Sequence, residues 1–459
     1  MNAPIQIAEG RCPGPSYQDI AGRNGRPIAE VLQRQSNPPQ SDADIPFARY
    51  TSRAWFDLEV QKMWRKVWQY ACRQEHIPNV GDFYVYDIGT KSVLVVRTAP
   101  DEIKAFHNSC LHRGTKLKPS GTEGWSQDFQ CPYHGWTWNL DGTLKHVPCR
   151  WDFPHVTEDR FHLPEVRVAT WNSFVFICMS PDTPPLMDYL EVLPEHFRNW
   201  RFDDWYIHIH VQKELPANWK LAQEAFMEAY HTPVAHPEMT HVVGDWNMQH
   251  DVFGDHVSRD LCLMATPSPA SKLGLSEQDL LDRMLKGDPE IVGSRITVPE
   301  GKSAREIMAQ ELRATLGKEF GIDCTIYTDA EMIDSIKYNL FPNIFIYAGV
   351  GFRQIQQFRP LGNDPDRCLY DHIVFRPVPK TGERPPPATP FHLGEDDSYS
   401  LVPGLDPFGA SVLDQDTGIM RLQREGMYAS EKGAETLSRY QESRIRAFED
   451  TLEKYINAE

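Results

Sequence analysis

The sequence lacks a long apolar run, a surplus of positive charge and a cysteine pattern of the disulfide-rich kind. No stretch reaches the roughly 18 consecutive apolar residues that a membrane-spanning helix needs. The first ten residues show no basic region followed by an apolar core, so we expect no secretion signal. A net charge of −17 argues against nucleic acid or an anionic membrane as a partner. Nine cysteines without framework spacing favour a reducing compartment, so we expect a cytoplasmic protein.

What is present is a chain of several parts. At 459 residues it is too long for one ordinary core, so we expect two or three domains. Hydrophobic residues make up 41% of the chain and charged residues 24%, which is typical of a globular protein. We predict an N-terminal arm over 1–45, a helical segment over 46–75 that packs on the last domain, a small all-β domain over 76–180, and a mixed domain over 181–459.

Several elements are predicted from hydrophobic spacing and from turn and cap residues. In the first half they are an amphipathic helix over 52–70, strands over 83–86, 92–96, 128–130 and 170–177, and a hairpin turn at Asp141-Gly142. In the second half they are a strand over 206–215, two helices within 245–335 capped by Ser276 and Ser303, adjacent strands over 344–359 and 368–376, and a terminal helix over 433–457.

The stretch 218–240 concentrates potential metal ligands. Glu228, His231 and His236 put one carboxylate and two imidazoles into nine residues. Apolar residues at helical spacing predict a buried amphipathic helix, on which Glu228 and His231 share a face. His236 would point away on an ideal helix, but Pro233 can bend or break it and bring the second imidazole back. Two converging imidazoles suit iron, zinc or copper, although two buried core histidines would show the same spacing.

A second cluster lies upstream, in the predicted all-β domain. Cys110 and His112 form Cys-x-His, and after eighteen residues Cys131 and His134 form Cys-x2-His. A zinc site is the alternative, but zinc fingers usually take both cysteines from one hairpin and both histidines from a helix. Here each loop offers one cysteine and one histidine, so two cysteines can bind one iron and two histidines the other. That is the ligand arrangement of a Rieske [2Fe–2S] centre.

Together the two clusters resemble the catalytic α subunit of Rieske non-haem iron oxygenases, the aromatic-ring-hydroxylating dioxygenase family. The resemblance rests on Cys-x-His…Cys-x2-His followed by Asn-Trp-Lys-Leu…Glu-x2-His-x4-His, in the family's order. It implies an α+β fold, with a small all-β Rieske domain inserted into a catalytic domain whose antiparallel sheet is flanked by helices. It also implies two cofactors: a [2Fe–2S] cluster on Cys110, His112, Cys131 and His134, and a mononuclear Fe(II) on His231 and His236.

The resemblance further implies a third iron ligand, an aspartate from far downstream. Asp416 is the candidate, because residues 422–427 after it look like the helix that follows the ligand aspartate in the family. Asp414 is the nearest competitor. Two histidines and one carboxylate would make the facial triad of non-haem iron oxygenases, which leaves positions open for O2.

At the position of Glu228 the family has an acidic residue, more often Asp, that bridges a Rieske histidine of the adjacent subunit to an iron-ligating histidine. A head-to-tail homotrimer is therefore implied, in which His134 or His112 of one subunit meets Glu228 of the next. Ala225 is a departure from many members, which carry Asn there, and removes a polar group near the iron. The sequence does not decide whether a small β subunit joins the trimer.

The implied activity is that of an oxygenase component that receives electrons from NAD(P)H through a reductase, directly or by way of a ferredoxin. With O2 it would hydroxylate an aromatic or other hydrophobic substrate, because the candidate pocket walls are apolar. These walls are Ala225, Phe226, Met239, Phe345 and Phe408. Monooxygenation or N- or O-demethylation of a methylated amine or a carboxylic acid is the alternative, since these reactions share one ligand set. A Glu at the bridging position also occurs in relatives that demethylate amines.

Two hypotheses of other classes stay open. A Rieske electron-transfer protein with a degenerate second domain would show cluster spectra but bind no second iron, and the intact set of Glu228, His231 and His236 argues against it. A structural zinc module would be colourless, whereas a Rieske centre is brown.

Overall fold

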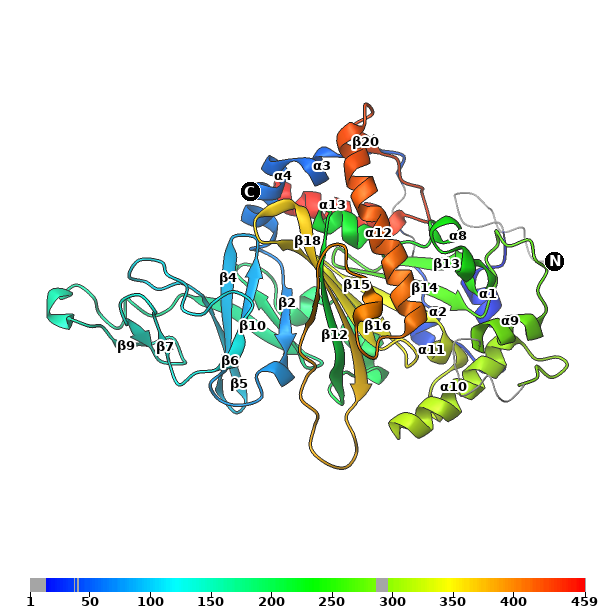
Figure 1. Cartoon of the computed structure of the whole chain (residues 1–459), viewed down its shortest axis with the longest axis horizontal. Helices are drawn as coiled ribbons and strands as arrows, with labels where there is room; N and C mark the ends of the chain where they lie inside the picture. The colour runs from blue at the N-terminus through cyan, green and yellow to red at the C-terminus, as the bar shows by residue number, and fades with distance from the viewer. Residues whose placement is uncertain (1–13, 37, 39–40, 286–295, 459) are drawn as a thin grey trace. The chain divides into compact units, whose positions relative to one another are not determined.

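The computed structural model describes residues 14–36, 38, 41–285 and 296–458 (Figure 1). These residues divide into two compact units. The larger takes its residues from Met1–Trp55, Leu190–Arg359 and Pro365–Lys454. The smaller takes them from Phe56–Tyr189, Pro360–Asp364 and Tyr455–Glu459. The smaller unit therefore interrupts the larger one along the chain, as the predicted fold class requires.

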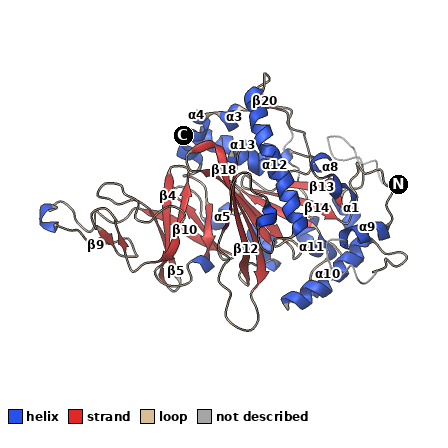
Figure 2. Cartoon of the chain, in the orientation of Figure 1, coloured by secondary structure: helices blue, strands red, loops and turns tan. Residues whose placement is uncertain are grey.

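The smaller unit consists mainly of strands and loops, as predicted (Figure 2). It holds a seven-stranded sheet of order β2-β11-β10-β5-β4-β3-β6 and a three-stranded sheet β7-β8-β9. Their bounds are β2 Gln69–Arg73, β3 Asp82–Ile88, β4 Lys91–Ala99, β5 Glu102–His107, β6 Glu123–Trp125, β7 Phe129–Gln130, β8 Thr137–Trp138, β9 Leu144–His146, β10 Glu165–Trp171 and β11 Phe174–Cys178.

The predicted hairpin turn at Asp141-Gly142 is confirmed and joins β8 to β9. Asn139 N–H donates to the Thr143 carbonyl at 2.9 Å, closing the turn. Gly142 has φ +87°, and a Cβ there would lie 2.5 Å from Cε1 of Phe106, so only glycine fits. Phe106 belongs to the core that supports the predicted cluster loops.

Two predictions in this unit are wrong. The helix expected over 52–70, and with it the helical segment over 46–75, ends at Met63. Helix α4 (Arg53–Leu58) continues as one π-helical turn (Glu59–Met63). The chain then forms β2, which pairs with β11. The apolar residues of this segment would be buried in a helix or in a strand, so their spacing alone could not distinguish the two conformations. The single strand expected over 170–177 is a hairpin of β10 and β11, turned at Asn172 and Ser173 with φ +55° and +64°.

The larger unit is built on an eight-stranded sheet of order β13-β14-β15-β16-β17-β18-β12-β19. Strands β13 to β17 pair antiparallel in sequence order, β12 pairs antiparallel with β18, and β19 runs parallel to β12. The bounds are β12 Trp205–Leu215, β13 Val243–Val252, β14 Val257–Met264, β15 Ser335–Leu340, β16 Ile344–Ala348, β17 Gln354–Leu361, β18 Asp364–Pro377 and β19 Phe391–Leu393. The predicted antiparallel sheet is thus confirmed, with β19 as its parallel edge.

Helices accompany this sheet, and two of them carry the candidate iron ligands. The bounds are α1 Tyr17–Ala21, α2 Glu30–Gln33, α3 Ala48–Thr51, α6 Leu193–His196, α7 Trp219–Glu224, α8 Thr232–Ala235, α9 Glu277–Leu285, α10 Ala304–Phe320, α11 Asp329–Ile333, α12 Pro407–Ala429 and α13 Ser443–Asn457. The long helix α12, orange in Figure 1, contacts α7. This contact brings the end of the chain to the histidine stretch.

The predicted caps are confirmed, while several predicted elements need correction. Ser303 forms a capping box for α10 with Glu306, and Ser276 accepts a hydrogen bond from Asp279 N–H ahead of α9. The region 245–335 also holds β13 and β14, which the sequence did not suggest. The run 344–359 is two strands, β16 and β17, and the terminal helix begins only at Ser443.

The described part of the predicted arm contains two short helices. Residues 14–36 include α1 and α2, which belong to the larger unit. Tyr17 Oη donates to Asp334, and Arg259 on β14 donates to the carbonyls of Val31 and Arg34. Helix α1 also contacts β13 and β14, so this segment packs on its own chain. Residues 1–13 of the predicted arm lie outside the described residues.

Candidate metal centres

The histidine stretch is not one helix, because α7 ends at Glu224. Asn218 caps its start by accepting a hydrogen bond from Lys220 N–H at 3.1 Å. Helix α8 begins only at Thr232, and His231 and His236 stand at its two ends. The sequence predicted a break near Pro233. The chain instead leaves the helix after Glu224, and Pro233 lies in the first turn of α8, where its missing N–H costs nothing.

This break brings the two histidines together with Asp416 of α12. Nε2 of His236 lies 2.8 Å from Oδ1 of Asp416, and Nε2 of His231 lies 3.4 Å from the same oxygen. The two imidazole centroids are 5.3 Å apart. One ligand atom from each of the three residues lies within 4.8 Å of the others, and they are the group of this kind found among the described residues.

The outer nitrogens of both rings are held by side chains. Nδ1 of His231 lies 2.5 Å from Oε1 of Glu228, and Nδ1 of His236 lies 2.6 Å from Oε1 of Gln415. When Nδ1 of each ring donates to these oxygens, the Nε2 lone pairs are free and face Asp416. Metal-binding histidines are commonly oriented in this way, so the donor set and its orientation fit a divalent iron.

Without a metal, hydrogen bonds among His231, His236 and Asp416 favour protonated imidazoles beside an ionised carboxylate. Burial opposes protonation of His231, but hydrogen bonds to Asp416 and Glu228 outweigh it and raise the pKa of His231 to about 10. Burial likewise opposes ionisation of Asp416, and hydrogen bonds with His231 and His236 still hold the pKa of Asp416 below its usual value. An incoming metal would replace this proton, since a ligating imidazole must be neutral.

Asp414, the competing third ligand, points elsewhere. Its carboxylate accepts hydrogen bonds from Ser398 Oγ at 2.6 Å and from Tyr399 N–H at 3.0 Å. Both partners precede α12, so Asp414 anchors the segment that leads into this helix. The preference for Asp416 over Asp414 therefore agrees with the geometry.

The two predicted cluster loops share one backbone conformation. In the first, Gly114 N–H donates to the Cys110 carbonyl at 2.9 Å, and in the second, Gly135 N–H donates to the Cys131 carbonyl at 3.1 Å. Gly114 and Gly135 have φ of +78° and +73°, which favours glycine at both positions. Each loop thus forms the same turn from its cysteine to its glycine, with the histidine one position later in the second loop.

The four side chains meet in like pairs. Burial raises the pKa of the Cys110 thiol and the neighbouring Cys131 thiol adds to this shift, while the rings of His112 and His134 have centroids 4.6 Å apart. Nδ1 of His112 is buried and has no hydrogen-bond partner among the described residues. Trp136 stacks on His112 at 5.1 Å and covers it. Two thiols on one side, two imidazoles on the other and an orphaned buried nitrogen fit a two-iron cluster.

Of the five predicted pocket residues, two pack against a common neighbour. Phe226 and Phe345 are buried and both pack against Phe358, with ring centroids 5.4 and 6.0 Å apart. Met239 packs, partly buried, on a separate apolar cluster that includes Ala229. Ala225 is partly buried at the end of α7. Phe408 is 48% exposed in the first turn of α12, so we no longer count it as a wall.

Sequence reasoning missed several residues around the iron triad. Gln415 gave no signal, because an amide beside two aspartates is common on a helix surface. Tyr370 stacks on Phe226 at 5.6 Å, and burial raises the pKa of its hydroxyl, with smaller contributions from Tyr399, Tyr347 and then Asp416. The alternating apolar pattern of its strand marked Tyr370 only as core.

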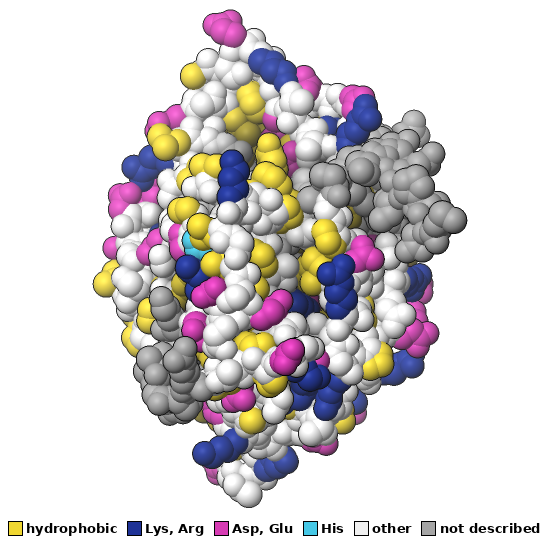
Figure 3. Space-filling view, turned by 90° about the vertical axis from the view of Figure 1, so that its right-hand side faces the viewer, with side chains coloured by type: hydrophobic (Ala, Val, Ile, Leu, Met, Phe, Trp, Pro, Cys, Tyr) yellow, Lys and Arg dark blue, Asp and Glu magenta, His cyan; other side chains and the backbone are white. Residues whose placement is uncertain are grey.

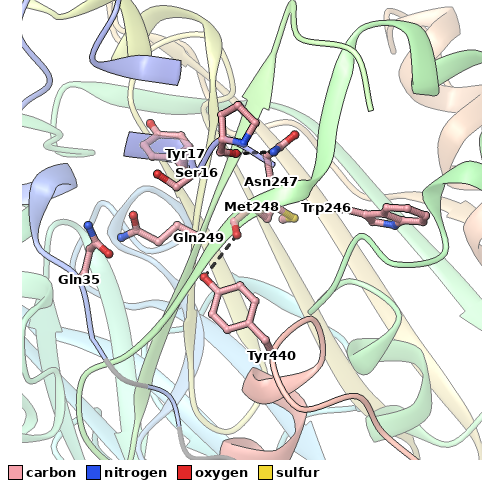
Figure 4. Close-up of a pocket in the computed structure, with 9 residues that line it drawn as sticks. Ser16, Tyr17, Gln35, Trp246, Asn247, Met248, Gln249 and Tyr440 are labelled. Atoms are coloured by element: carbon pink, nitrogen blue, oxygen red, sulfur yellow. Dashed lines mark hydrogen bonds between the residues drawn. The ribbon is translucent and has the colours of Figure 1, made fainter. Parts of the chain in front are cut away.

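A separate pocket lies in the larger unit, between the N-terminal segment and β13 (Figure 4). Asn247 donates to the Pro15 carbonyl across it, and Tyr440 donates to the Met248 carbonyl. None of the five predicted substrate residues lines it. Its lining is Pro15, Ser16, Tyr17, Gln35, Trp246, Asn247, Met248, Gln249 and Tyr440.

Two surface properties bear on possible partners. No helix among the described residues combines the length and apolarity needed to cross a membrane. On the face shown in Figure 3, acidic and basic side chains are interspersed, so the negative net charge does not gather into one patch there.

Comparison with known proteins agrees with this arrangement. Residues 202–458 match the ring hydroxylating alpha subunit (catalytic domain) family, and residues 67–157 match the Rieske [2Fe-2S] domain. The glycine betaine monooxygenase oxygenase subunit of Pseudomonas aeruginosa is 30% identical over 203 residues, 44% of this chain and 47% of that protein. The terephthalate 1,2-dioxygenase terminal oxygenase component subunit alpha 2 of Comamonas sp is 37% identical over 204 residues, 42% of this chain and 48% of that protein. The chain thus spans about half the length of these curated relatives.

Solved structures share the fold at low sequence identity. A quaternary ammonium Rieske monooxygenase in complex with L-carnitine has a TM-score of 0.63 at 16% identity, over 90% of this chain and 96% of that one. Naphthalene 1,2-dioxygenase with indole bound has a TM-score of 0.63 at 16% identity, over 92% and 94%. The predicted Rieske cluster and mononuclear iron are characteristic of the two matched domains. Because the catalytic-domain match covers more than half of the chain, this protein belongs to the ring-hydroxylating α-subunit family, with a Rieske domain ahead of its catalytic domain.

Proposed function

We propose that this chain is the oxygenase component of a multicomponent Rieske oxygenase, which uses O2 and electrons from an NAD(P)H-dependent reductase, with or without a ferredoxin. Cys110, His112, Cys131 and His134 would hold the [2Fe–2S] cluster, within a Rieske domain over 76–180. His231, His236 and Asp416 would hold Fe(II), within a catalytic domain over 181–459. The eight cysteines in the described part of the chain are free thiols, which supports a cytoplasmic location.

One observation carries this proposal: two imidazoles whose Nε2 atoms face one carboxylate while Glu228 and Gln415 hold their outer nitrogens. Two core histidines would need no such orientation. When bound, the iron would supply activation of O2, which no side chain can provide. The protein's own part is to aim both imidazoles and to keep Asp416 ionised, and the metal would displace the imidazole proton when it binds.

Electron delivery to this site is best served by a head-to-tail homotrimer. In the smaller unit, His134 is exposed beside Tyr133, which is itself 57% exposed. In the larger unit, Glu228 borders Tyr230 and Val234, which are 55% and 88% exposed. Large apolar side chains exposed next to both groups support contact between subunits there. His134 or His112 of one subunit would then hydrogen-bond Glu228 of the next.

The proposed substrate class rests on three aromatic residues of the larger unit. Phe226, Phe358 and Tyr370 form a buried group of packed aromatic rings, and Asp416 of the triad acts electrostatically on Tyr370. Such surface suits an aromatic or other hydrophobic substrate, which is our first proposal. It also suits a methylated ammonium group, whose cation is attracted to aromatic faces. Because relatives include a glycine betaine monooxygenase, N-demethylation of a methylated amine is the second candidate.

The test is the mass of products formed under ¹⁸O2 with a surrogate reductase and NADH. The substrate panel holds aromatic carboxylic acids, polycyclic hydrocarbons and trimethylammonium compounds. Two labelled oxygens in one product would establish dioxygenation of that compound. One labelled oxygen, or formaldehyde released from a methyl group, would establish the monooxygenase reading.

Metal content, measured on the same preparation, separates the remaining hypotheses. A brown protein with Rieske spectra but no iron beyond the cluster, and no product, would overturn the proposal in favour of an electron-transfer protein. A colourless protein containing zinc would overturn it in favour of a structural metal module.

A further inference from the structure

Four backbone groups at the break between α7 and α8 have hydrogen-bond partners from outside a regular helix. In a continuous helix the carbonyls of Phe226 and Met227 would accept from the N–H groups of Tyr230 and His231. Here both donors are taken by one carboxylate: the N–H groups of Tyr230 and His231 donate to Oε2 of Glu228, the latter at 3.1 Å. The predicted bridge residue therefore also caps the chain that carries the iron ligand.

The two released carbonyls are taken by cations. Lys337 of β15 donates through Nζ to the Phe226 carbonyl, and Arg444 of α13 donates through Nη1 to the Met227 carbonyl at 3.0 Å. Both cations meet one carboxylate, Asp260 of β14: Nζ of Lys337 lies 3.3 Å from its Oδ2, and Nη1 of Arg444 hydrogen-bonds the same oxygen. Asp260 and Lys337 are direct cross-strand partners, so the sheet register fixes this arrangement.

All three charged side chains are buried. Asp260 and Arg444 have fully buried side chains, and that of Lys337 is 9% exposed. Placing two cations and one anion inside a protein is unfavourable unless they are paired and hydrogen-bonded. Apolar residues could be buried at a lower cost in free energy, but they have no N–H group to donate to the two buried carbonyls. The charged cluster therefore supplies the two donors that the released carbonyls at the helix break require.

We propose that Lys337 and Arg444, held by Asp260, are positioning residues that fix the turn from Phe226 to His231 and so set Glu228 and His231 toward the iron. This inference rests on the proposed iron site and adds residues from β14, β15 and α13 to it. Removal of either cation would leave a buried carbonyl unpaired, and the turn would gain by rewinding toward a helix. Rewinding would withdraw the Tyr230 and His231 N–H groups from Glu228.

The test compares Lys337→Met and Arg444→Met, which keep most of the side-chain volume and remove the donor. Arg259→Met is the matched control. Arg259 is equally buried, pairs with the buried Asp251 and donates to backbone carbonyls, but these belong to Val31 and Arg34. Each protein is loaded with its Rieske cluster, stripped of mononuclear iron and titrated with ferrous iron. Cobalt(II) absorption spectra then report ligand geometry.

We expect a loss of ferrous iron affinity of about 10- to 100-fold and an altered cobalt spectrum in both test variants. Arg259→Met should lose thermal stability and keep wild-type iron affinity. Lys337→Arg, which restores a donor, should recover affinity at least in part. If Arg444→Met does not fold, Lys337→Met with its Lys337→Arg rescue carries the test.

The inference and the proposed function fail in different ways. If wild-type protein binds iron at the second site, and Lys337→Met and Arg444→Met bind it as tightly as Arg259→Met with unchanged cobalt spectra, the positioning role is overturned. If wild-type protein itself binds no iron beyond its cluster, the proposed iron site is overturned, and the role of Lys337 and Arg444 with it.

Discussion

Oε1 of Glu228 lies 2.5 Å from Nδ1 of His231, while Oε2 of the same carboxylate accepts from the backbone of the following turn. One side chain therefore orients the imidazole and caps the chain that carries it. Asp commonly accepts from the same two backbone donors at a helix N-cap, so the capping role does not itself require the longer side chain of Glu.

Glu228→Gln keeps the side-chain length but offers one acceptor oxygen in place of two. We expect both metals to be retained, with turnover lowered by about 10-fold or more, because the imidazole and the proposed contact to the next subunit both depend on the carboxylate. Iron analysis, Rieske spectra and coupled turnover measure this. Unchanged turnover would remove Glu228 from the electron path.

Asp416→Ala should abolish binding of mononuclear iron and turnover, because it removes one of three ligands. The Rieske spectrum should stay as in the wild type. Asp414→Ala is the control, since this carboxylate holds Ser398 and Tyr399 instead. It should lower thermal stability and keep the iron. The reverse pattern in iron content would assign the third ligand to Asp414.

Gln415→Leu removes the acceptor that holds the ring of His236. We expect iron affinity to fall by about 10- to 100-fold, as for other partners of metal-bound histidines. Gln415→Glu keeps an acceptor oxygen and should remain close to wild type. Titration with ferrous iron compares the three proteins, and equal affinities would show that the orientation of His236 comes from packing alone.

Cys131→Ala should remove the Rieske absorption and its electron paramagnetic resonance signal, because the proposed cluster loses a thiolate ligand. Cys149→Ala provides a control in the same unit, since Cys149 is an exposed free thiol. It should keep the full cluster spectrum. Loss of the cluster in both variants would point to general misfolding of the smaller unit.

Stability should respond to pH through a partly buried carboxyl group on β20 (Ala434–Glu435). Burial, aided by the neighbouring Glu449, raises the pKa of Glu435 from 4.5 to about 7, against a hydrogen bond from Tyr50. A carboxyl whose pKa is raised by folding holds more protons when folded, so its contribution to stability falls as pH rises from 4.5 to about 7.

Glu435→Gln, which cannot ionise, should therefore raise Tm by about 2 °C at pH 8 and leave it nearly unchanged at pH 5. Thermal scans of the cluster-loaded protein at both pH values measure this. Glu425→Gln, on the exposed side of α12, should change Tm little at either pH. An equal gain for Glu435→Gln at pH 5 and pH 8 would contradict the assignment.

The sequence determined the parts of this protein that local spacing encodes. The proposed cluster ligands lie in two short stretches, 110–112 and 131–134, and each stretch is followed by a glycine that permits its turn, so the cluster could be proposed without a fold. His231 and His236 were readable for the same reason. The strands and hairpin of the smaller unit also follow from local alternation and turn residues.

Only the tertiary structure decided what depends on contacts distant in sequence. The sequence preferred Asp416 over Asp414 only through the family resemblance, whereas the fold places Asp416 beside His231 and His236 and directs Asp414 to Ser398 and Tyr399. Gln415, Lys337 and Arg444 had no local signal, because each acts on a residue more than a hundred positions away. The same contacts explain the wrongly predicted helix: the apolar spacing after Glu224 favours a helix, but buried charges from β14, β15 and α13 satisfy a broken one.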